Sequence, residues 1–231
     1  MNIKCLIKKL INRIVFGYKS SPELFVRWLR NNGIKVGEGT IFFDPINTVV
    51  DTQNPKLLKI GSNVRITSGC KILTHDFSSS VIAGAYGECI GSLGTVDIGD
   101  NVFIGVNSVI LKNTRIGNNV IIGAGSVVSG NIEADSVYAG IPAKRIMTLK
   151  ECYLKRKNKC ESDIINVLAK IDTYNPSELW KYMREYSCYF TDSPIELRNR
   201  VMGDTGYKEI CETFYKLNPP VRRIGEYLDE K

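Results

Sequence analysis

The sequence predicts a mainly β protein: a triangular solenoid of stacked coils with helical segments at both ends. Two observations support this. An aliphatic residue recurs every six positions through the middle of the chain, and Asn or Gly follows three positions after nearly every one. A period of six fits neither one helix nor one flat strand, but six residues can form a short extended segment and a corner. Three such segments close a coil of about 18 residues, and stacked coils bury columns of side chains.

The N-terminal segment, residues 1–32, is predicted to be helical. Its apolar residues recur at helical spacing between basic ones, and a second helix is expected to start at Pro22 with Ser20 and Glu23 as a capping box. The apolar positions of the first helix are Leu6, Ile7, Leu10, Ile11, Ile14 and Val15, and the basic ones are Lys4, Lys8, Lys9 and Arg13. Two roles are open: a cap on the first coil, or peripheral contact with an anionic membrane.

The solenoid is predicted over residues 33–147. The aliphatic positions are Ile60, Ile66, Ile72, Ile98, Ile104, Ile110, Ile116, Ile122 and Val128. A second inward position, four residues further on, holds Val64, Cys70, Val102, Ser108, Thr114, Val120, Ser126 and Ile132. A weaker block, Ile34, Thr40 and Ile46, keeps the same rhythm. We expect all these side chains to face inward.

Corners of such coils need residues that tolerate positive φ, which favours Gly and Asn. The expected corner residues are Asn63, Gly69, His75, Asn101, Asn107, Asn113, Asn119, Gly125 and Asn131. Eight of these nine are Asn or Gly, and the ninth is the only histidine in the chain.

The six-residue rhythm is interrupted twice. Extra residues fall around Thr52–Leu57, where Pro55 would interrupt a ladder. A longer insertion, the loop 77–95, begins two residues after His75. Because long loops in compact domains tend to be functional, we expect this loop to form a flap or a wall beside His75. Residues 148–231, with eight of the eleven tyrosines, Trp180 and a helix start at Ser193, are predicted to form a helical extension.

Composition and charge exclude several classes of protein. Hydrophobic residues make up 43% and charged residues 24%, and no apolar run approaches the roughly 18 residues of a membrane-spanning helix. The start of the chain lacks the pattern of a secretory signal peptide. Seven cysteines without a C-x-x-C pair indicate reduced thiols in a cytoplasmic protein. The net charge of +7 gathers on the two flanks without a nucleic-acid-reading element, so we expect no nucleic-acid partner.

Several stretches resemble the hexapeptide-repeat acyltransferases. They are Ile-Gly-Asp-Asn-Val-Phe-Ile-Gly (98–105), Ile-Gly-Asn-Asn-Val-Ile-Ile-Gly-Ala-Gly-Ser-Val-Val (116–128) and Ala-Gly-Ile-Pro-Ala-Lys (139–144), which looks like the family's closing turn. Lys-Ile-Leu-Thr-His-Asp (71–76) resembles the active-site segment of the branch that acetylates sugars and xenobiotics. The resemblance covers residues 34–147. It implies a left-handed parallel β-helix, acetyl-CoA as donor, and a homotrimer with active sites between adjacent subunits.

The resemblance implies that His75 is the catalytic base. Imidazole is neutral near pH 7 and can accept a proton. In the family, this histidine removes a proton from the acceptor hydroxyl, which attacks the acetyl thioester directly. The residues alone leave open that a corner position merely happens to be His, a residue type that tolerates positive φ.

Three residues are candidates for the acceptor side. Asp51 and Asp76 are placed to orient His75 or the acceptor sugar. Galactoside and maltose acetyltransferases have an acceptor-binding Asp one coil before the His, so the resemblance favours acceptor contact for Asp51. Asp76 falls at an inward position, where an unpaired carboxylate would be costly; either it has a partner or the chain leaves the coil there. Asn47 is a loose counterpart of the family's acceptor-binding Asn.

The donor residues are carried over from the family by position. The resemblance implies that Phe103, Val106, Ala124, Ser129 and Gly130 contact the pantetheine arm of CoA. The family often has Thr-Lys where this chain has Ser129-Gly130, so one cationic phosphate contact is missing.

Two residues after the closing turn are the candidates for the CoA phosphates. Lys144 matches a CoA-phosphate position in the family, and Arg145 is placed to compensate for the missing cation. The alternative for both is solvated charge after a turn.

The predicted function is acetyl-CoA-dependent O-acetylation of a sugar hydroxyl in a bacterial surface glycan, such as capsular polysaccharide or lipopolysaccharide, in the cytoplasm or at the inner face of the membrane. Alternatives are N-acetylation of a nucleotide-linked amino sugar and a non-catalytic binding solenoid. Cys70 is a candidate acyl nucleophile, but its inward position favours a buried hydrophobe. One histidine cannot supply the three ligands of a three-histidine zinc site, so no metal is expected.

Overall fold

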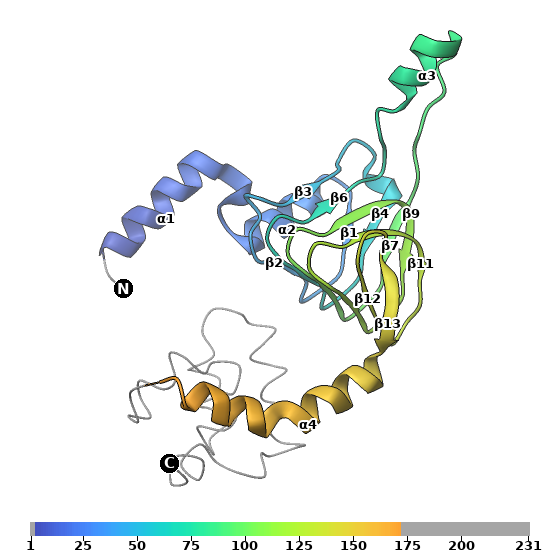
Figure 1. Ribbon diagram of the computed structural model, residues 1–231. Helices are drawn as coiled ribbons and strands as arrows, with labels where there is room; N and C mark the ends of the chain where they lie inside the picture. The colour runs from blue at the N-terminus through green and yellow to red at the C-terminus, as the bar shows by residue number, and fades with distance from the viewer. Residues whose placement is uncertain (1–2, 172–231) are drawn as a thin grey trace. The chain divides into compact units, whose positions relative to one another are not determined.

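The computed structural model describes residues 3–171, without the side chains of residues 3–6, 8 and 9. The chain divides into two compact units, Met1–Cys152 and Tyr153–Lys231. The first unit contains a β-helix with three faces, which we call faces 1, 2 and 3 (Figure 1). Each coil contributes one short strand segment to each face.

Strands of successive coils lie side by side within each face. Face 1 consists of β1 (Lys35–Val36), β4 (Leu58–Ile60), β7 (Val96–Ile98) and the second halves of β9 (Val109–Ile116) and β11 (Val127–Ile132). Face 2 consists of β2 (Ile41–Phe42), β5 (Arg65–Ile66), β8 (Val102–Ile104), β10 (Val120–Ile122) and β12 (Ser136–Ala139). Face 3 consists of β3 (Val49–Val50), β6 (Lys71–Ile72) and the first halves of β9 and β11. All these pairs are parallel, and β13 (Lys144–Thr148) closes face 2 antiparallel to β12.

The predicted inward columns are confirmed through the central coils. Ile98 pairs with Ile116 and Val102 with Val120, so equivalent residues stack. Every predicted aliphatic position from Ile60 to Val128 is buried, as are the second inward positions from Val64 to Ser126. Burial of these methyl and methylene groups is the main stabilising term of the domain.

The first coil departs from the predicted register. Val36, Phe42 and Val50 pair with the aliphatic positions of the next coil, whereas Ile46 is exposed. The placement of Ile46 in the core was therefore wrong. The reason is that additional residues lie between β2 and β3, so the six-residue count does not carry through this coil.

The last coil is shortened. Ile132 pairs with Ile116 and so belongs to the aliphatic column rather than to the second inward position. The register of β11 against β9 shifts between Val128 and Gly130. As a result Gly130, with φ 76°, takes the positive-φ conformation that we expected of Asn131.

Seven of the nine predicted corners have positive φ, between 55° and 73°. These residues are Asn63, Gly69, Asn101, Asn107, Asn113, Asn119 and Gly125. His75 does not, so its prediction as a corner was wrong. There the chain leaves the coil instead of closing the corner: His75 forms an antiparallel bridge with Leu93, and the Gly94 N–H donates to the Thr74 carbonyl at 2.9 Å.

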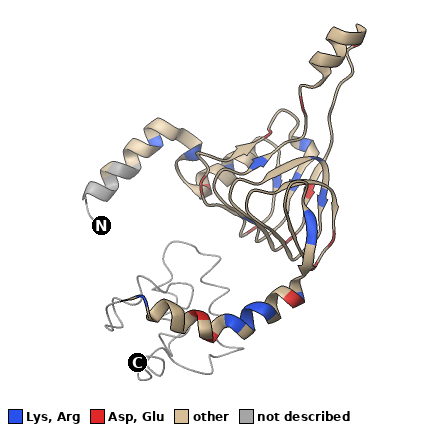
Figure 2. Ribbon diagram, in the orientation of Figure 1, with Lys and Arg blue, Asp and Glu red and all other residues tan. Residues whose placement is uncertain are grey.

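Residues 76–92, which we call the arm, project from the β-helix at this point (Figure 1). The predicted loop contains a helix that the sequence analysis missed, α3 (Ser79–Tyr86), which ends at Gly87 with φ 73°. Figure 2 shows no charged residue in α3. Phe77, Val81 and Tyr86 on the arm are 73–80% exposed.

The N-terminal segment forms α1 (Ile3–Phe16), η1 (Gly17–Ser20) and α2 (Pro22–Asn31). The cap of α2 is Ser21 rather than Ser20: its hydroxyl accepts a hydrogen bond from the Leu24 N–H at 3.2 Å, because Ser21 is the residue with extended backbone before the first turn. α2 covers the first coil by burying Phe25, Val26 and Leu29 in the core. The predicted cap on the solenoid is thus confirmed for α2.

Two further elements complete the described part of the chain. The short helix η2 (Pro55–Leu57) lies at the predicted interruption around Thr52–Leu57. α4 (Leu149–Leu168) begins with a capping box in which Thr148 and Glu151 exchange hydrogen bonds of 2.7 and 3.1 Å. The predicted helix start at Ser193 lies outside the described residues. Between residues 3 and 171, no helix is both long and apolar enough to cross a membrane.

Candidate active site

The site is built around His75, three residues beyond β6. Its Nδ1 lies 2.5 Å from Oδ2 of Asp51, the residue that directly follows β3. The pairing of β3 with β6 brings these two residues together, although they are 24 positions apart. The His75 side chain is 21% exposed and that of Asp51 only 2%, so the carboxylate is buried while the imidazole remains partly accessible.

The Asp51 carboxylate is held by donors on several sides. Oδ2 accepts hydrogen bonds from the Thr74 hydroxyl at 2.5 Å and the Thr74 N–H at 3.1 Å, and Oδ1 accepts one from the Gln53 N–H at 3.1 Å. Burial by itself would raise the pKa of Asp51, but the hydrogen bonds from Thr74, His75 and Gln53 outweigh it and lower the pKa below 3.8. Asp51 is therefore ionised at neutral pH.

This geometry decides what the imidazole can do. An ionised carboxylate can only accept hydrogen bonds, so Nδ1 of His75 carries the proton that Asp51 accepts. In the neutral imidazole, Nε2 then keeps its lone pair and is able to take a proton from a bound molecule. The Phe77 ring stands edge-on to the imidazole, with 5.9 Å between ring centroids, and forms one wall beside it.

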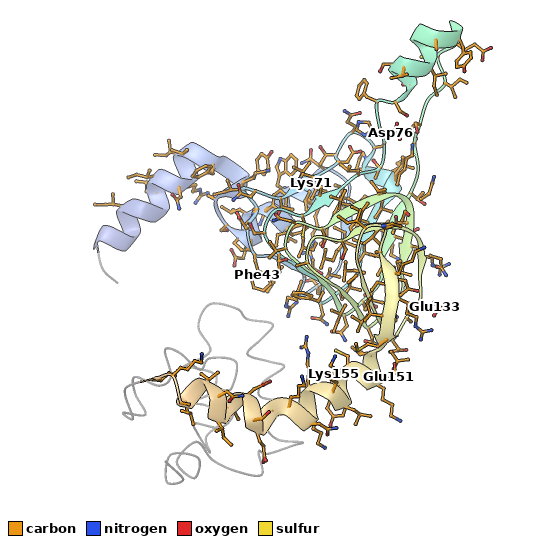
Figure 3. The ribbon with its side chains drawn as sticks, in the orientation of Figure 1. Phe43, Lys71, Asp76, Glu133, Glu151 and Lys155 are labelled. Carbon is orange, nitrogen blue, oxygen red and sulfur yellow. The ribbon has the colours of Figure 1, made fainter. Side chains whose placement is uncertain are left out.

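Asp76 is exposed and fastens the base of the arm, where Figure 3 labels it. Its carboxylate accepts hydrogen bonds from the Ser78 N–H at 3.0 Å and the Ser92 hydroxyl at 3.0 Å, and it forms an ion pair with Lys112 of β9. The Lys112 ammonium also contacts the Ser92 hydroxyl. Both expectations for Asp76 are met, because the chain leaves the coil there and the carboxylate has a partner.

Lys112 was not identified from the sequence. It holds the pKa of Asp76 well below its usual range, with Ser78 and Ser92 contributing further hydrogen bonds. Its ammonium joins the outgoing leg of the arm, at Asp76, to the returning leg, at Ser92. The signal that could have identified Lys112 is its position: it comes just before the corner Asn113, which is the counterpart of His75 in the next coil.

Asn47 lies in the turn between β2 and β3. Its side-chain amide donates to Asp44 Oδ2 at 2.7 Å, and Asp44 also accepts a hydrogen bond from the Ser68 hydroxyl at 2.6 Å. These bonds, led by the one from Ser68, lower the pKa of Asp44. Within residues 3–171, no hydrogen bond joins Asn47 to His75 or Asp51.

The residues expected to contact the donor lie at two corners and one face. Val106 and Ala124 lie at the corner between faces 2 and 3 in adjacent coils, where the Gly125 N–H donates to the Val106 carbonyl at 2.7 Å. Phe103 projects from face 2, and all three side chains are exposed. Ser129 and Gly130 lie at the corner between faces 3 and 1, on the same edge of the β-helix as His75.

Lys144 and Arg145 are exposed on β13. Arg145 pairs with Glu133, its Nη1 lying 3.1 Å from Oε2 of that residue. Part of the Arg145 charge is thus already neutralised, whereas Lys144 has no ion pair among residues 3–171.

Cys70 is fully buried, and its thiol donates to the Gly105 carbonyl at 3.2 Å. Burial raises the pKa of this thiol, which keeps it protonated and unreactive. The interpretation of Cys70 as a buried hydrophobe is confirmed.

Comparison with known proteins identifies the family of the chain. The sequence model of the family "Bacterial transferase hexapeptide (six repeats)" matches residues 95–130, which lie in the most regular coils. Protein CapG of Staphylococcus aureus is 40% identical over 122 residues, which are 53% of this chain and 70% of CapG. The chain belongs to the hexapeptide-repeat acetyltransferase family. The family resemblance is thereby confirmed.

Solved structures of family members are also similar to the chain. A hexapeptide-repeat-containing acetyltransferase from Vibrio cholerae is 27% identical, with a TM-score of 0.43 over 50% of this chain and 62% of its own. A maltose O-acetyltransferase from Clostridium difficile 630 is 28% identical, with a TM-score of 0.38 over 55% of this chain and 75% of its own. This chain thus spans less than two thirds of the Vibrio acetyltransferase.

Proposed function

We propose that this protein is an acetyl-CoA-dependent O-acetyltransferase that modifies a sugar hydroxyl of a bacterial surface glycan. The observation that carries the proposal is the contact of 2.5 Å between His75 Nδ1 and the buried carboxylate of Asp51 in a family β-helix. A buried, ionised carboxylate that fixes one imidazole tautomer leaves the other ring nitrogen available as a general base.

In the proposed reaction, Nε2 of His75 takes the proton of the acceptor hydroxyl. The oxygen attacks the acetyl carbonyl of the thioester, so a C–O bond forms and the C–S bond breaks. The proton on Nε2 then passes to the departing thiolate, which restores the neutral imidazole. Asp51 stabilises the transient imidazolium and keeps the ring oriented, so we assign it as a positioning residue.

The acceptor class rests on the segment 71–76, which resembles that of the sugar-acetylating branch. Acceptor contact was also expected of Asp51, but its side chain is 2% exposed and occupied by Thr74, His75 and Gln53. Asp76 and Asn47, both exposed, are the remaining candidates for polar contact with a sugar.

Acetyl-CoA as donor follows from family membership. We propose that Phe103, Val106 and Ala124 contact its pantetheine arm, and that Ser129 and Gly130, at the next corner of the coil that contains Ala124, also contact the donor. We propose that Lys144 holds a phosphate, with Arg145 beside it. Phe103, Val106, Ala124 and Lys144 are all exposed and so accessible to a ligand. Among the described residues, Lys144 also has no ion pair.

The outward side chains of the β-helix support the proposal that the protein assembles into a homotrimer in which a neighbouring copy completes each site. On face 1 they form the row Lys35, Lys59, Asp97, Arg115 and Asn131, all exposed. On face 2 the row is Ile41, Arg65, Phe103, Ile121 and Val137, and on face 3 it is Val49, Lys71, Val109 and Val127. Faces 2 and 3 are therefore mostly apolar, which favours contact with another copy. Because His75 follows β6 of face 3, a copy packed there would lie beside the site.

The assembly is tested by light scattering coupled to size-exclusion chromatography. Ile121→Lys on face 2 should lower the mass from that of a trimer, whereas the matched variant Asn131→Lys on face 1 should leave it unchanged. A monomeric wild-type protein, or equal behaviour of the two variants, would contradict the assignment of these faces.

The activity is tested by supplying acetyl-CoA with a panel of sugars and glycan fragments. We expect CoA release and an acetylated product that mild alkali cleaves, as for an ester. An alkali-stable product would instead indicate amide formation on an amino sugar. If acetyl-CoA neither binds nor turns over and His75→Ala changes nothing, the protein is a binding solenoid rather than an enzyme.

A further inference from the structure

The helix α1 carries an apolar surface that the rest of the described chain does not cover. Its aliphatic side chains Ile7, Leu10, Ile11, Ile14 and Val15 are 51–75% exposed. Residues 7, 10, 11 and 14 are spaced by three or four positions and so share one face of the helix. In α2, which follows along the chain, the apolar residues Phe25, Val26 and Leu29 are buried.

The charge of this segment has one sign. α1 contains Lys4, Lys8, Lys9 and Arg13 and no acidic residue, and the first acidic residue of the chain is Glu23. Figure 2 shows no acidic residue in the described part of α1. An exposed apolar face on a purely cationic helix is complementary to a surface that is apolar beneath and anionic outside.

The chain that follows α1 is attached without using that face. The Tyr18 ring stacks on Trp28 with 4.0 Å between centroids, and the Lys19 ammonium donates to the Thr48 carbonyl at 2.9 Å. Phe25 packs edge-on against Phe42 in the first coil, with 4.9 Å between centroids. The attachment of the N-terminal segment therefore depends on η1 and α2, and it leaves the apolar face of α1 available.

We propose that α1 binds the surface of an anionic phospholipid membrane and lies in its interface. A helix of 14 residues is about 21 Å long, too short to span a hydrocarbon core of about 30 Å. It can bury its aliphatic face at the headgroup boundary while its basic residues contact lipid phosphates. Another copy of α1 is a poorer occupant, because like charges on the copies would repel each other. The proposal does not depend on the acetyltransferase activity.

The test is flotation of the full chain with lipid vesicles. We expect the protein to float with vesicles of phosphatidylcholine and phosphatidylglycerol at a 70:30 ratio, to float far less with phosphatidylcholine alone, and to be partly released at about 0.5 M salt. Leu10→Asp combined with Ile14→Asp should reduce binding by about tenfold or more, because it places carboxylates on the buried face. Ile165→Asp, at an exposed position of α4, is the matched control and should bind like wild type.

Three outcomes would overturn the proposal: no flotation with the anionic vesicles, equal flotation of the double variant and wild type, or a change in oligomeric mass of the double variant. The last would assign the face to contact between copies. Circular dichroism of the double variant checks that it folds. Since the readout is binding, it is independent of whether the proposed acetyl transfer is found.

Discussion

Asn113 and His75 occupy equivalent places in consecutive coils, each three residues after a buried isoleucine of face 3, yet the chain does opposite things there. At Asn113, with φ 59°, the coil closes its corner. At His75 the chain turns outward into the arm and returns at Gly94, where an added Cβ would lie 2.1 Å from Asn113 Oδ1.

The difference teaches how a repetitive fold acquires a site. A closed corner uses its residue for backbone geometry, whereas an interrupted corner frees a side chain for other contacts. Side chains from three consecutive coils meet at the interruption: Asp51 after β3, His75 after β6, and Lys112 of β9 at the arm. The preceding coil thus holds the proposed catalytic imidazole through Asp51, and the next coil holds the base of the arm through Lys112.

The largest expected effect comes from removing the imidazole. His75→Ala should lower acetyl transfer by about 10²–10⁴-fold, the usual contribution of a general base, while the far-ultraviolet circular dichroism stays that of wild type. The measurement is the rate of CoA release with a responsive acceptor. Activity within about twofold of wild type would show that the interrupted corner has no catalytic role.

The second effect comes from neutralising the group that orients the imidazole. Asp51→Asn keeps the size of the side chain but removes the negative charge, and we expect turnover to fall by about tenfold to a hundredfold. Because Asp51 is assigned to His75 and not to the acceptor, kcat should fall with little change in the acceptor KM. A change confined to KM would instead support acceptor binding.

The same variant, Asp51→Asn, should also change how the free energy of unfolding depends on pH. The pKa of Asp51 is lowered from 3.8 in the folded chain, so this group stabilises the protein above about pH 4, and that stabilisation is lost as the pH falls through the lowered pKa. Urea unfolding at pH 6 and pH 3 should therefore show a smaller acid-induced loss for Asp51→Asn than for wild type. An equal loss would mean that Asp51 is not the titrating group.

The third effect concerns the closed corner and tests whether the positive φ of Asn113 limits which residue can stand there. Asn113→Ala places an ordinary side chain at φ 59° and should lower the free energy of unfolding by about 1–2 kcal/mol, whereas Asn113→Gly should be close to neutral because glycine tolerates this conformation. Urea titration of both variants measures the difference. Equal stability of the Ala and Gly variants would show that backbone conformation does not determine this position.

The smallest effect concerns the contacts of Lys112 with Asp76 and Ser92 at the base of the arm. Lys112→Met removes a partly exposed ion pair and should leave the free energy of unfolding nearly unchanged, but amide hydrogen exchange in residues 77–92 should become faster. Lys112→Arg should restore protection, and Lys71→Met on face 3 serves as the control. Unchanged exchange in Lys112→Met would show that the arm is held by its backbone bonds alone.

The sequence predicted the regular coils well and their ends poorly. The inward columns and seven corners follow from local chemistry, because aliphatic and Asn or Gly residues mark positions within single hexads. Ile46 and Ile132 were misplaced because inserted or missing residues shift the count without a local signal. The helix α3 was missed because Gly and Ser are frequent in that segment and suggested a loop.

By itself, then, the sequence determined the solenoid, its period, the family and the candidate His75. It also gave Asp51 as a candidate to orient His75 or the acceptor, and the tertiary structure decided for His75. Only the tertiary structure decided that Thr74 holds Asp51 and that Lys112 holds the base of the arm. The physical reason is the parallel ladder. Residues in neighbouring coils are brought together by strand register, and that register depends on how many residues each coil extrudes between its strands.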